Sequence, residues 1–217
     1  MNRFSIISGL GIVFLLLASF GFANVVTTTM TWVVANTKSI SIAYTSPCTS
    51  SAFFFVETTA LFDPDSDGNG AKVAPQGGRA AGDANCQTSA VAPVLITNNG
   101  TGDVNVDGNF AASLSGNDVN IVLKVWLGST GCGGTGANGG YGGWEARCTS
   151  IAPFDTVTAP TTSACRSFDN NNWTTGARII TNLTRTSAQQ LCFSGDFNVL
   201  VPAGDHNGNF QIGSQYS

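Results

Sequence analysis

The fold and function expected of this chain depend on two adjacent segments, Asn24-Val-Val-Thr-Thr-Thr-Met-Thr-Trp-Val-Val-Ala35 and Lys38-Ser-Ile-Ser-Ile-Ala-Tyr44. Successive side chains of a β-strand point to opposite faces, and β-branched and aromatic residues favour strands. On such a strand Thr27, Thr29 and Thr31 line one face. The other face is apolar in both segments, which Asn36 and Thr37 separate. Its members all have even numbers, so they share one face of a continuous strand: Val26, Met30, Trp32, Val34, Ile40, Ile42 and Tyr44. A strand this apolar must be buried, either in its own domain or in another subunit.

The segment before this stretch has the pattern of a secretion signal. Arg3 provides a positive start, residues 6–22 are mostly apolar, and Gly21-Phe22-Ala23 supplies the small residues of a cleavage site. A retained membrane anchor is the alternative, but the segment is short for a span and no basic cluster follows. A type IV pilin helix would need helix-forming sequence next. We therefore expect cleavage after Ala23, a secreted chain with no membrane contact afterwards, and one domain over residues 24–217.

Charged residues are scarce in this chain. Asp, Glu, Lys and Arg make up 10% of the residues, and the net charge is −4. A negative net charge argues against nucleic acid or anionic lipid as a partner. A surface rich in hydroxyls and amides but poor in charge suits packing against other molecules or carrying sugar.

The remaining pattern is that of an all-β protein. No stretch carries a helical period, whereas alternation of period two recurs and turn sequences rich in Gly, Asn and Asp separate the segments. This spacing predicts a single antiparallel β-sandwich of about eight strands, jelly-roll or immunoglobulin-like. We expect Pro93 to push its strand toward a sheet edge. Besides the two N-terminal strands, the expected strands are residues 52–58, 91–97, 103–114, 119–127, 178–184 and 191–201.

Six cysteines predict disulfide bonds, because their number is even, they follow a secretion signal, and they lack metal-ligand spacing. Among the many connectivities we favour sequential pairing, with each bond stabilising the fold by about 2–4 kcal/mol. The expected bonds are Cys48–Cys86, Cys132–Cys148 and Cys165–Cys192.

One acidic loop has the ligand spacing of a calcium site. Oxygen-bearing side chains alternate before a glycine, as in the first half of a calcium-binding loop, at Asp63, Asp65, Asp67 and Asn69. The acidic residue expected at the twelfth position is replaced by Ala74. The alternative is a polar loop built from Asx-turns. Residues 103–108 share the spacing, but their valines make them a better strand.

No catalytic arrangement is evident, so we predict that the chain is not an enzyme and has no cofactor, with calcium the one candidate ion. Residues 131–136 match a dinucleotide-binding pattern, but no helix follows them. His206 is the only histidine, and its surroundings favour a turn. Three Asn-x-Thr sequons are candidate glycan acceptors, although some arise by chance in such a sequence: Asn99, Asn172 and Asn182.

The secretion signal, the Val/Thr-rich strand that follows it, and the charge-poor β-pattern resemble secreted filament subunits, namely the TasA-type matrix fibres and the archaeal bundling pili and threads. The resemblance implies a head-to-tail homopolymer at the cell surface, in which each N-terminal strand completes the sheet of the next subunit. It places that donor strand at residues 25–35. The six cysteines depart from TasA itself and indicate a filament subunit with more disulfide bonds. The donor residues would be Val25, Val26, Thr28, Met30, Trp32 and Val34.

Two alternatives fit the same sequence features. A secreted carbohydrate-binding sandwich would use Tyr141, Trp144 or Trp173 for stacking on sugar rings, and calcium would stabilise it. A surface-layer or coat component would assemble in two dimensions or into closed shells.

Overall fold

Strands form the regular structure of the chain in the computed structural model, which describes residues 38–49, 54–55, 71–79, 83–88, 90–114, 121–132, 150–197 and 206–216. The predicted secretion signal and the predicted donor strand lie outside these ranges. Among the residues that the structure describes, no helix is long and apolar enough to cross a membrane. The strands are β1 (Ile40–Tyr44), β2 (Ala71–Val73), β3 (Val94–Asn98), β4 (Val104–Phe110), β5 (Ile121–Gly128), β6 (Ser150–Ile151), β7 (Ala164–Phe168), β8 (Ala177–Leu183), β9 (Ala188–Phe197) and β10 (Phe210–Tyr216).

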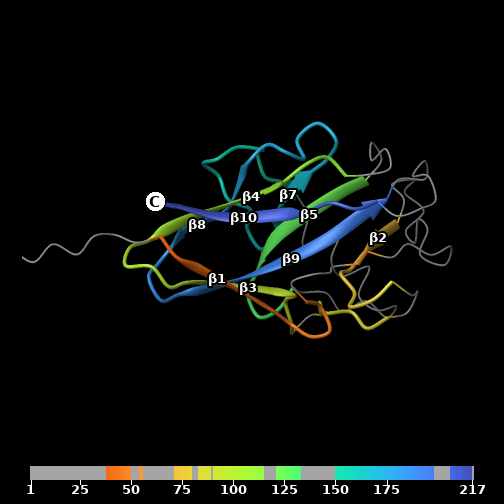
Figure 1. The fold of residues 1–217 in the computed structure, drawn as a ribbon, viewed down its shortest axis with the longest axis horizontal. Coiled ribbons are helices and arrows are strands. Elements are labelled where there is room, and N and C mark those ends of the chain that lie inside the picture. Colours follow the sequence, from red (N-terminus) through yellow and green to blue (C-terminus); the bar gives the residue numbers. More distant parts are fainter. Residues whose placement is uncertain are drawn as a thin grey trace, which may run out of the picture. The chain divides into compact units, whose positions relative to one another are not determined.

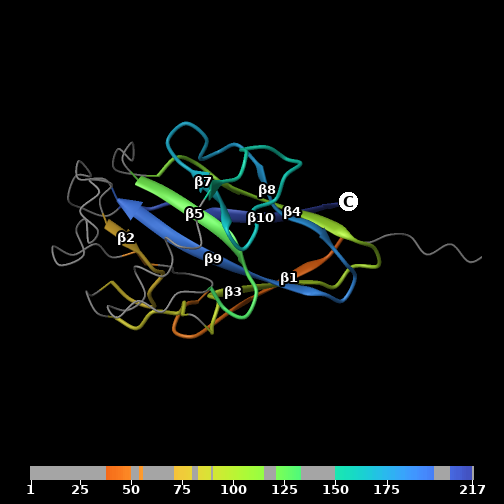
Figure 2. The same ribbon diagram turned by 180° about the vertical axis from the view of Figure 1, so that it is seen from behind.

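The strands form two sheets (Figures 1 and 2). The larger has the order β1-β3-β9-β5-β7-β6, with β2 also pairing with β9, and the smaller has the order β10-β4-β8. All pairs are antiparallel except β6 with β7. The two sheets bury a shared apolar core, so the predicted all-β sandwich is confirmed.

Alternating apolar side chains build this core. In β4 the odd-numbered residues are half-buried, whereas Val104, Val106, Gly108 and Phe110 are buried. Aromatic rings meet edge to face across the core, where such contacts stabilise by roughly 1 kcal/mol beyond their buried area. The Phe110 ring lies 4.7 Å from Trp173 and 5.2 Å from Phe210 between ring centroids. Members from both sheets are Val94, Ile96, Ile121, Leu123, Val125, Phe168, Leu191 and Phe193 of the larger, and Val104, Val106, Phe110, Ala177, Ile179, Ile180 and Leu183 of the smaller.

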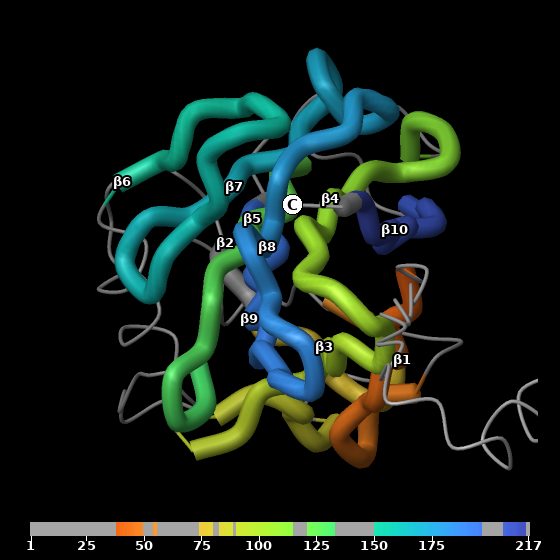
Figure 3. Tube along the Cα trace, turned by 90° about the vertical axis from the view of Figure 1, so that its left-hand side faces the viewer, coloured from red at the N-terminus to blue at the C-terminus, as the bar shows by residue number. Residues whose placement is uncertain are grey.

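One side of the sandwich is joined by hydrogen bonds between the sheets. Arg166 of β7 is fully buried, and its Nη2 donates to the carbonyl oxygen of Arg178 in β8 at 3.1 Å. The backbone N–H of Arg178 in turn donates to the carbonyl of Asp155 at 2.8 Å. The opposite side contains the edge strands β1 and β10, which Figure 3 shows on the same side of the sandwich.

The outer face of the larger sheet carries a second buried cluster. It contains Trp126 of β5 and Cys192 of β9, covered by Ala74 and Ala92 from earlier loops, by Cys132 from the loop after β5, and by Cys165. A disulfide joins Cys132 to Cys192, with the Cα atoms 5.5 Å apart. This bond fastens the loop after β5 over the face of the sheet, so that the sheet is covered on both faces in this region.

The Cys132–Cys192 bond shows that two of the sequential pairings are wrong. Cys132 does not pair with Cys148, and Cys165 does not pair with Cys192. Cys165 is disulfide-bonded, but its partner lies outside the described residues. The third predicted bond, Cys48–Cys86, is present, with a Cα separation of 5.6 Å. The pairing of β5 with β9 explains the correction, because it brings Trp126 opposite Cys192 and the end of β5 close to that strand.

A side-chain amide bonds to β9 in the gap between the two described strands that pair with one of its sides. On one side of β9, β3 pairs with Ala188–Leu191 and β2 with Gly195–Phe197. Between them, Gln87 donates its Nε2 to the carbonyl of Phe193 at 2.8 Å. Its Oε1 accepts the Phe193 N–H, also at 2.8 Å. Gln87 is 1% exposed, so this amide replaces a backbone partner inside the protein.

Most strand predictions agree with the structure, and the exceptions have physical reasons. β1, β3, β4, β5, β8 and β9 lie within or across the predicted ranges. The expected edge position of the Pro93 strand is wrong: Pro93 immediately precedes β3, which lies between β1 and β9. Of residues 52–58 only Phe54 and Phe55 are described, and Phe54 forms a bridge with Gln76. Four of the described strands were not predicted from the sequence patterns: β2, β6, β7 and β10.

Candidate functional site

Strand β1 presents an unpaired edge next to the core. Among the described residues it pairs only with β3. The N–H of Asn99 donates to the carbonyl of Ser39, and that of Thr45 to the carbonyl of Pro93, so the odd-numbered positions bond to β3. Bonded and non-bonded pairs alternate in an antiparallel ladder. Ile40 and Ile42 therefore turn their N–H and C=O groups away from β3, toward the open side.

Strand β10 repeats this arrangement at the edge of the smaller sheet. It pairs only with β4 in the part of the chain that the structure describes. The N–H of Ala111 donates to the carbonyl of Asn209, which makes the odd-numbered positions of β10 the bonded ones. The backbone groups of Phe210 and Ile212 consequently face the open side.

The residues with outward backbone groups also carry the core-facing side chains. Ile40, Ile42, Phe210 and Ile212 all pack against the main core, yet each remains partly exposed. Covering one such side chain stabilises by roughly 1 kcal/mol. An extended segment with alternating apolar residues would pair with these backbone groups and cover these side chains together, which is the chemistry of strand addition.

The described chain reaches the start of β1 beside a turn that the side chain of Asn98 holds together. Asn98 is fully buried, and its Nδ2 donates to the carbonyls of Gly102 at 2.9 Å and Leu183 at 2.8 Å. Its Oδ1 accepts the N–H of Gly100 at 2.8 Å. The neighbouring Asn99 bonds to Ser39, where the described chain approaches β1. The start of β1 is therefore held against a rigid turn.

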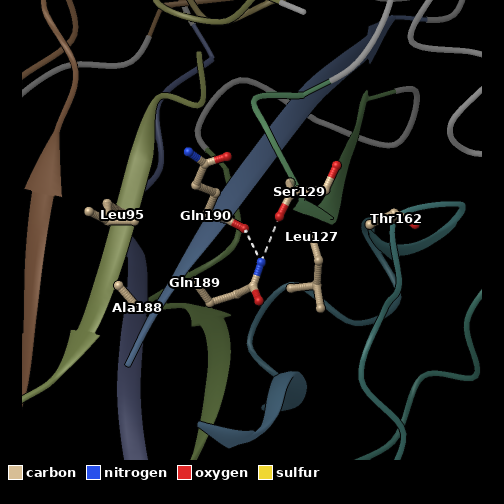
Figure 4. Close-up of a pocket in the computed structure, with 8 residues that line it drawn as sticks. Leu95, Leu127, Ser129, Thr162, Ala188, Gln189 and Gln190 are labelled. Carbon is tan, nitrogen blue, oxygen red and sulfur yellow. Dashed lines mark hydrogen bonds between the residues drawn. The ribbon is translucent and has the colours of Figure 1, made fainter. Parts of the chain in front are cut away.

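A second candidate place is a hollow of about 390 Å³ at the end of the larger sheet where β5 ends and β9 begins. Figure 4 shows Leu95 of β3, Gln189 and Gln190 of β9, and Leu127 at the end of β5 around it. The Gln189 Nε2 donates to the carbonyls of Gly128 and Gln190, so this amide is already engaged. The residues around the hollow carry no ionisable side chain, and they offer amides, hydroxyls and two leucines to a ligand.

The most perturbed charged groups lie at the joined side of the sandwich. The N–H groups of Thr158 and Val157 donate to Asp155 Oδ1 and hold the pKa of that carboxyl below its ordinary value. Burial lowers the pKa of the Arg166 guanidinium, which the charges of Asp155 and Asp107 oppose. Arg166 donates to the carbonyls of Ala152, Thr158 and Arg178. Because an arginine that spends its donors on backbone carbonyls holds a loop in place, we assign this cluster a structural role.

The predicted site residues fall in several places. The calcium candidates Asp63, Asp65, Asp67 and Asn69 lie outside the described residues, as do Tyr141 and Trp144. Within the described ranges no three His, Cys, Asp or Glu residues are grouped as a metal site would require. Trp173 is wrong as a sugar-stacking residue, because it is 1% exposed and packs on Phe110.

The three sequons differ in their surroundings. Asn99 and Asn182 are exposed. Asn172 is half-buried, and its side chain closes a turn: Oδ1 accepts the Asp169 N–H at 2.8 Å and Nδ2 points to the Ser167 carbonyl at 3.4 Å.

The open edges were not predicted as such, since the alternation in β10 is short. Phe210 and Ile212 flanking Gln211 were the signal available.

No protein-family model, no curated protein and no solved structure matches this chain significantly. Fold and site together define a disulfide-bonded β-sandwich in which two strands on one side, β1 and β10, have one edge open among the described residues. Disulfides fit a protein that folds in an oxidising compartment.

Proposed function

We propose that this protein is the structural subunit of an extracellular filament, assembled when the N-terminal strand of one subunit adds to the open side of the next. The observation that carries the proposal is the coincidence, on β1 and β10, of outward backbone groups with half-exposed core side chains. The segment at residues 25–35 has the matching alternation of apolar side chains, and it immediately precedes the open side in the chain.

The geometry of such a contact favours a polymer. A donated strand and an acceptor edge are different surfaces, so the contact is head-to-tail, and a head-to-tail contact that does not close continues as a filament. The low charge of the chain reduces repulsion between neighbouring copies. A secreted, cell-surface location follows from the predicted signal at residues 1–23.

The test is negative-stain electron microscopy of the mature chain and of a chain that lacks residues 24–35. We expect filaments from the first and monomers or poorly folded protein from the second, because the truncated chain has no strand to donate. Trp32→Asp should also abolish filaments by placing a charge on the apolar face. Its matched control, Thr31→Asp, changes the other face and should still assemble.

Normal filaments from the truncated chain would refute the proposal. Monomers from both chains would redirect attention to the neutral hollow beside Leu95 and Gln189, and to the alternative of a carbohydrate-binding module. That alternative predicts binding to polysaccharide by the monomer, which glycan arrays measure directly. Sheets or closed shells in the micrographs would instead indicate a surface-layer or coat component.

The sequons provide a separate prediction for a cell that glycosylates such sites. We expect glycans on the exposed Asn99 and Asn182 but not on Asn172, since the side chain of Asn172 is engaged in its turn. Glycopeptide mass spectrometry would measure the occupancy of each site. Thr101→Ala and Thr184→Ala serve as controls, because each removes one sequon and should remove only that glycan. Full occupancy of Asn172 would contradict the ranking.

A further inference from the structure

The two open edges raise the question of which strand receives the N-terminal segment and in what register. We propose that residues Met30–Val34 pair antiparallel with β1, with Val34 opposite Ile40 and Trp32 opposite Ile42, and that a subunit can form this pairing with its own segment before exchanging it with a neighbour. This inference rests on the proposed function, because it specifies the strand to which the same donor strand binds.

The short connection between the donor segment and β1 supports β1 as the strand that receives the segment. The described chain begins at Lys38, two residues before β1, and only Ala35–Ser39 separate the donor segment from that strand. A five-residue connection is long enough for a β-hairpin. It allows the segment to fold back along the edge of the strand that follows it in the chain. Ile40 and Ile42 already direct their backbone groups to that edge.

The pattern of side chains then selects the register. Residues directly opposite each other in a sheet point to the same face, and a slip by one residue exchanges the faces. With Val34 opposite Ile40, the apolar Met30, Trp32 and Val34 join the face that packs on the core. A connection shorter by one residue would place Ala35 opposite Ile40 and turn Thr29 and Thr31 toward the core. Burying hydroxyls without partners is costly, so the five-residue connection is favoured.

The same pairing can form within one chain or between two. If Ala35–Ser39 turns back, the subunit covers its own open side and stays monomeric. If these residues extend, the segment continues the line of β1 with the same face apolar and reaches the next subunit. The interface is identical in both states, as in other strand-swapped assemblies. Assembly would therefore be an exchange that the length of this connection controls.

Paired cysteines on the outer face test the register. Thr31 and Ala43 would face each other as a non-hydrogen-bonded pair, whose Cα atoms lie about 4.5 Å apart, a separation suited to a disulfide. In the mature chain carrying Thr31→Cys and Ala43→Cys, we expect an intrachain link in the monomer fraction and a ladder of linked chains in the filament fraction. Non-reducing gels show the ladder, and mass spectrometry of non-reduced digests identifies the linked peptides.

A second pair tests the competing seat. Thr31→Cys combined with Gln211→Cys places the thiols on the segment and on the exposed outer face of β10. Linkage of this pair, but not of the first, would overturn the assignment to β1 while leaving the filament intact. An intrachain link in the first pair, with no filament from the unsubstituted mature chain, would keep the register and refute the proposed function. No link in either pair would refute the inference.

The connection offers an independent check. Deleting Asn36 and Thr37 preserves the alternation but leaves three residues for the turn, and a short hinge under strain favours exchange between chains. We expect fewer monomers and more filaments than from the unsubstituted chain. Inserting two glycines after Asn36 should shift the ratio the other way. Equal monomer fractions in both variants, measured by size-exclusion chromatography, would contradict the exchange.

Discussion

Replacing Gln87 by leucine should cost the folded protein about 2–4 kcal/mol of unfolding free energy, because a buried polar group without a partner costs about 1–3 kcal/mol. The substitution removes the two hydrogen bonds that Gln87 makes with the N–H and the C=O of Phe193 in the gap between β3 and β2. Leucine fills a similar volume, so a cavity contributes little. Chemical unfolding of the mature, disulfide-intact chain measures the effect.

Gln211 provides a matched control for this experiment. It lies on the exposed face of β10, and Gln211→Leu makes the same chemical change where water can hydrate the neighbouring groups. Substitutions at such surface positions usually stay within about 0.5 kcal/mol. If the two variants unfold at the same denaturant concentration, the amide of Gln87 does not substitute for a strand, and the account of β9 given above is wrong.

Replacing Arg166 by methionine should have an effect of similar size, about 2–4 kcal/mol, because each buried carbonyl that loses its donor costs about 1–3 kcal/mol. Three carbonyls lose their donor, those of Ala152, Thr158 and Arg178, and Asp155 loses a nearby positive charge. The Phe154 ring, whose centroid lies 5.6 Å from the guanidinium carbon, loses a cation–π contact.

The Arg166 prediction has a local readout as well as a global one. The N–H of Arg178 donates to the Asp155 carbonyl across the joined side of the sandwich, so its hydrogen exchange should accelerate in the variant. Arg166→Lys should restore little, since an ammonium group cannot reproduce the planar fork of donors. The exposed Arg185 gives the control substitution Arg185→Met. Unchanged exchange at Arg178 would show that Arg166 does not connect the sheets.

Local alternation predicted the regular strands of this fold. β4 and β5 were predicted because their side chains alternate in and out. The structure buries Val104, Val106, Phe110, Ile121, Leu123 and Val125 as expected, whereas Leu127 is only half-buried and Trp126 is buried as well. β7 was missed for the opposite reason: it buries the consecutive residues Cys165 and Arg166, so its sequence, Ala-Cys-Arg-Ser-Phe, has no clean period. A buried arginine satisfied by backbone carbonyls does not differ, in sequence, from an exposed one.

Contacts between distant parts of the chain could not be predicted in this way. Cys132 meets Cys192 because β5 lies beside β9, and Gln87 reaches Phe193 across a separation of 106 residues. Sequential pairing of cysteines assumes that neighbours in sequence are neighbours in space, which the order β3-β9-β5 violates. The open side was likewise invisible, since an edge is defined by the absence of a neighbouring strand rather than by a residue type.

The turn at Asn98 determines how this subunit would respond to tension. If the N-terminal segment continues the line of β1, as proposed for the filament, a pull on it would reach the fold at Ser39 and act along β1, whose five residues pair with β3. Force along a strand loads its cross-strand bonds together in shear, whereas force across the strand would open them one after another. β3 in turn transmits the load to the central strand β9. In the proposed filament the fold would therefore be loaded in its mechanically stronger direction, and single-molecule stretching of linked copies should show high rupture forces.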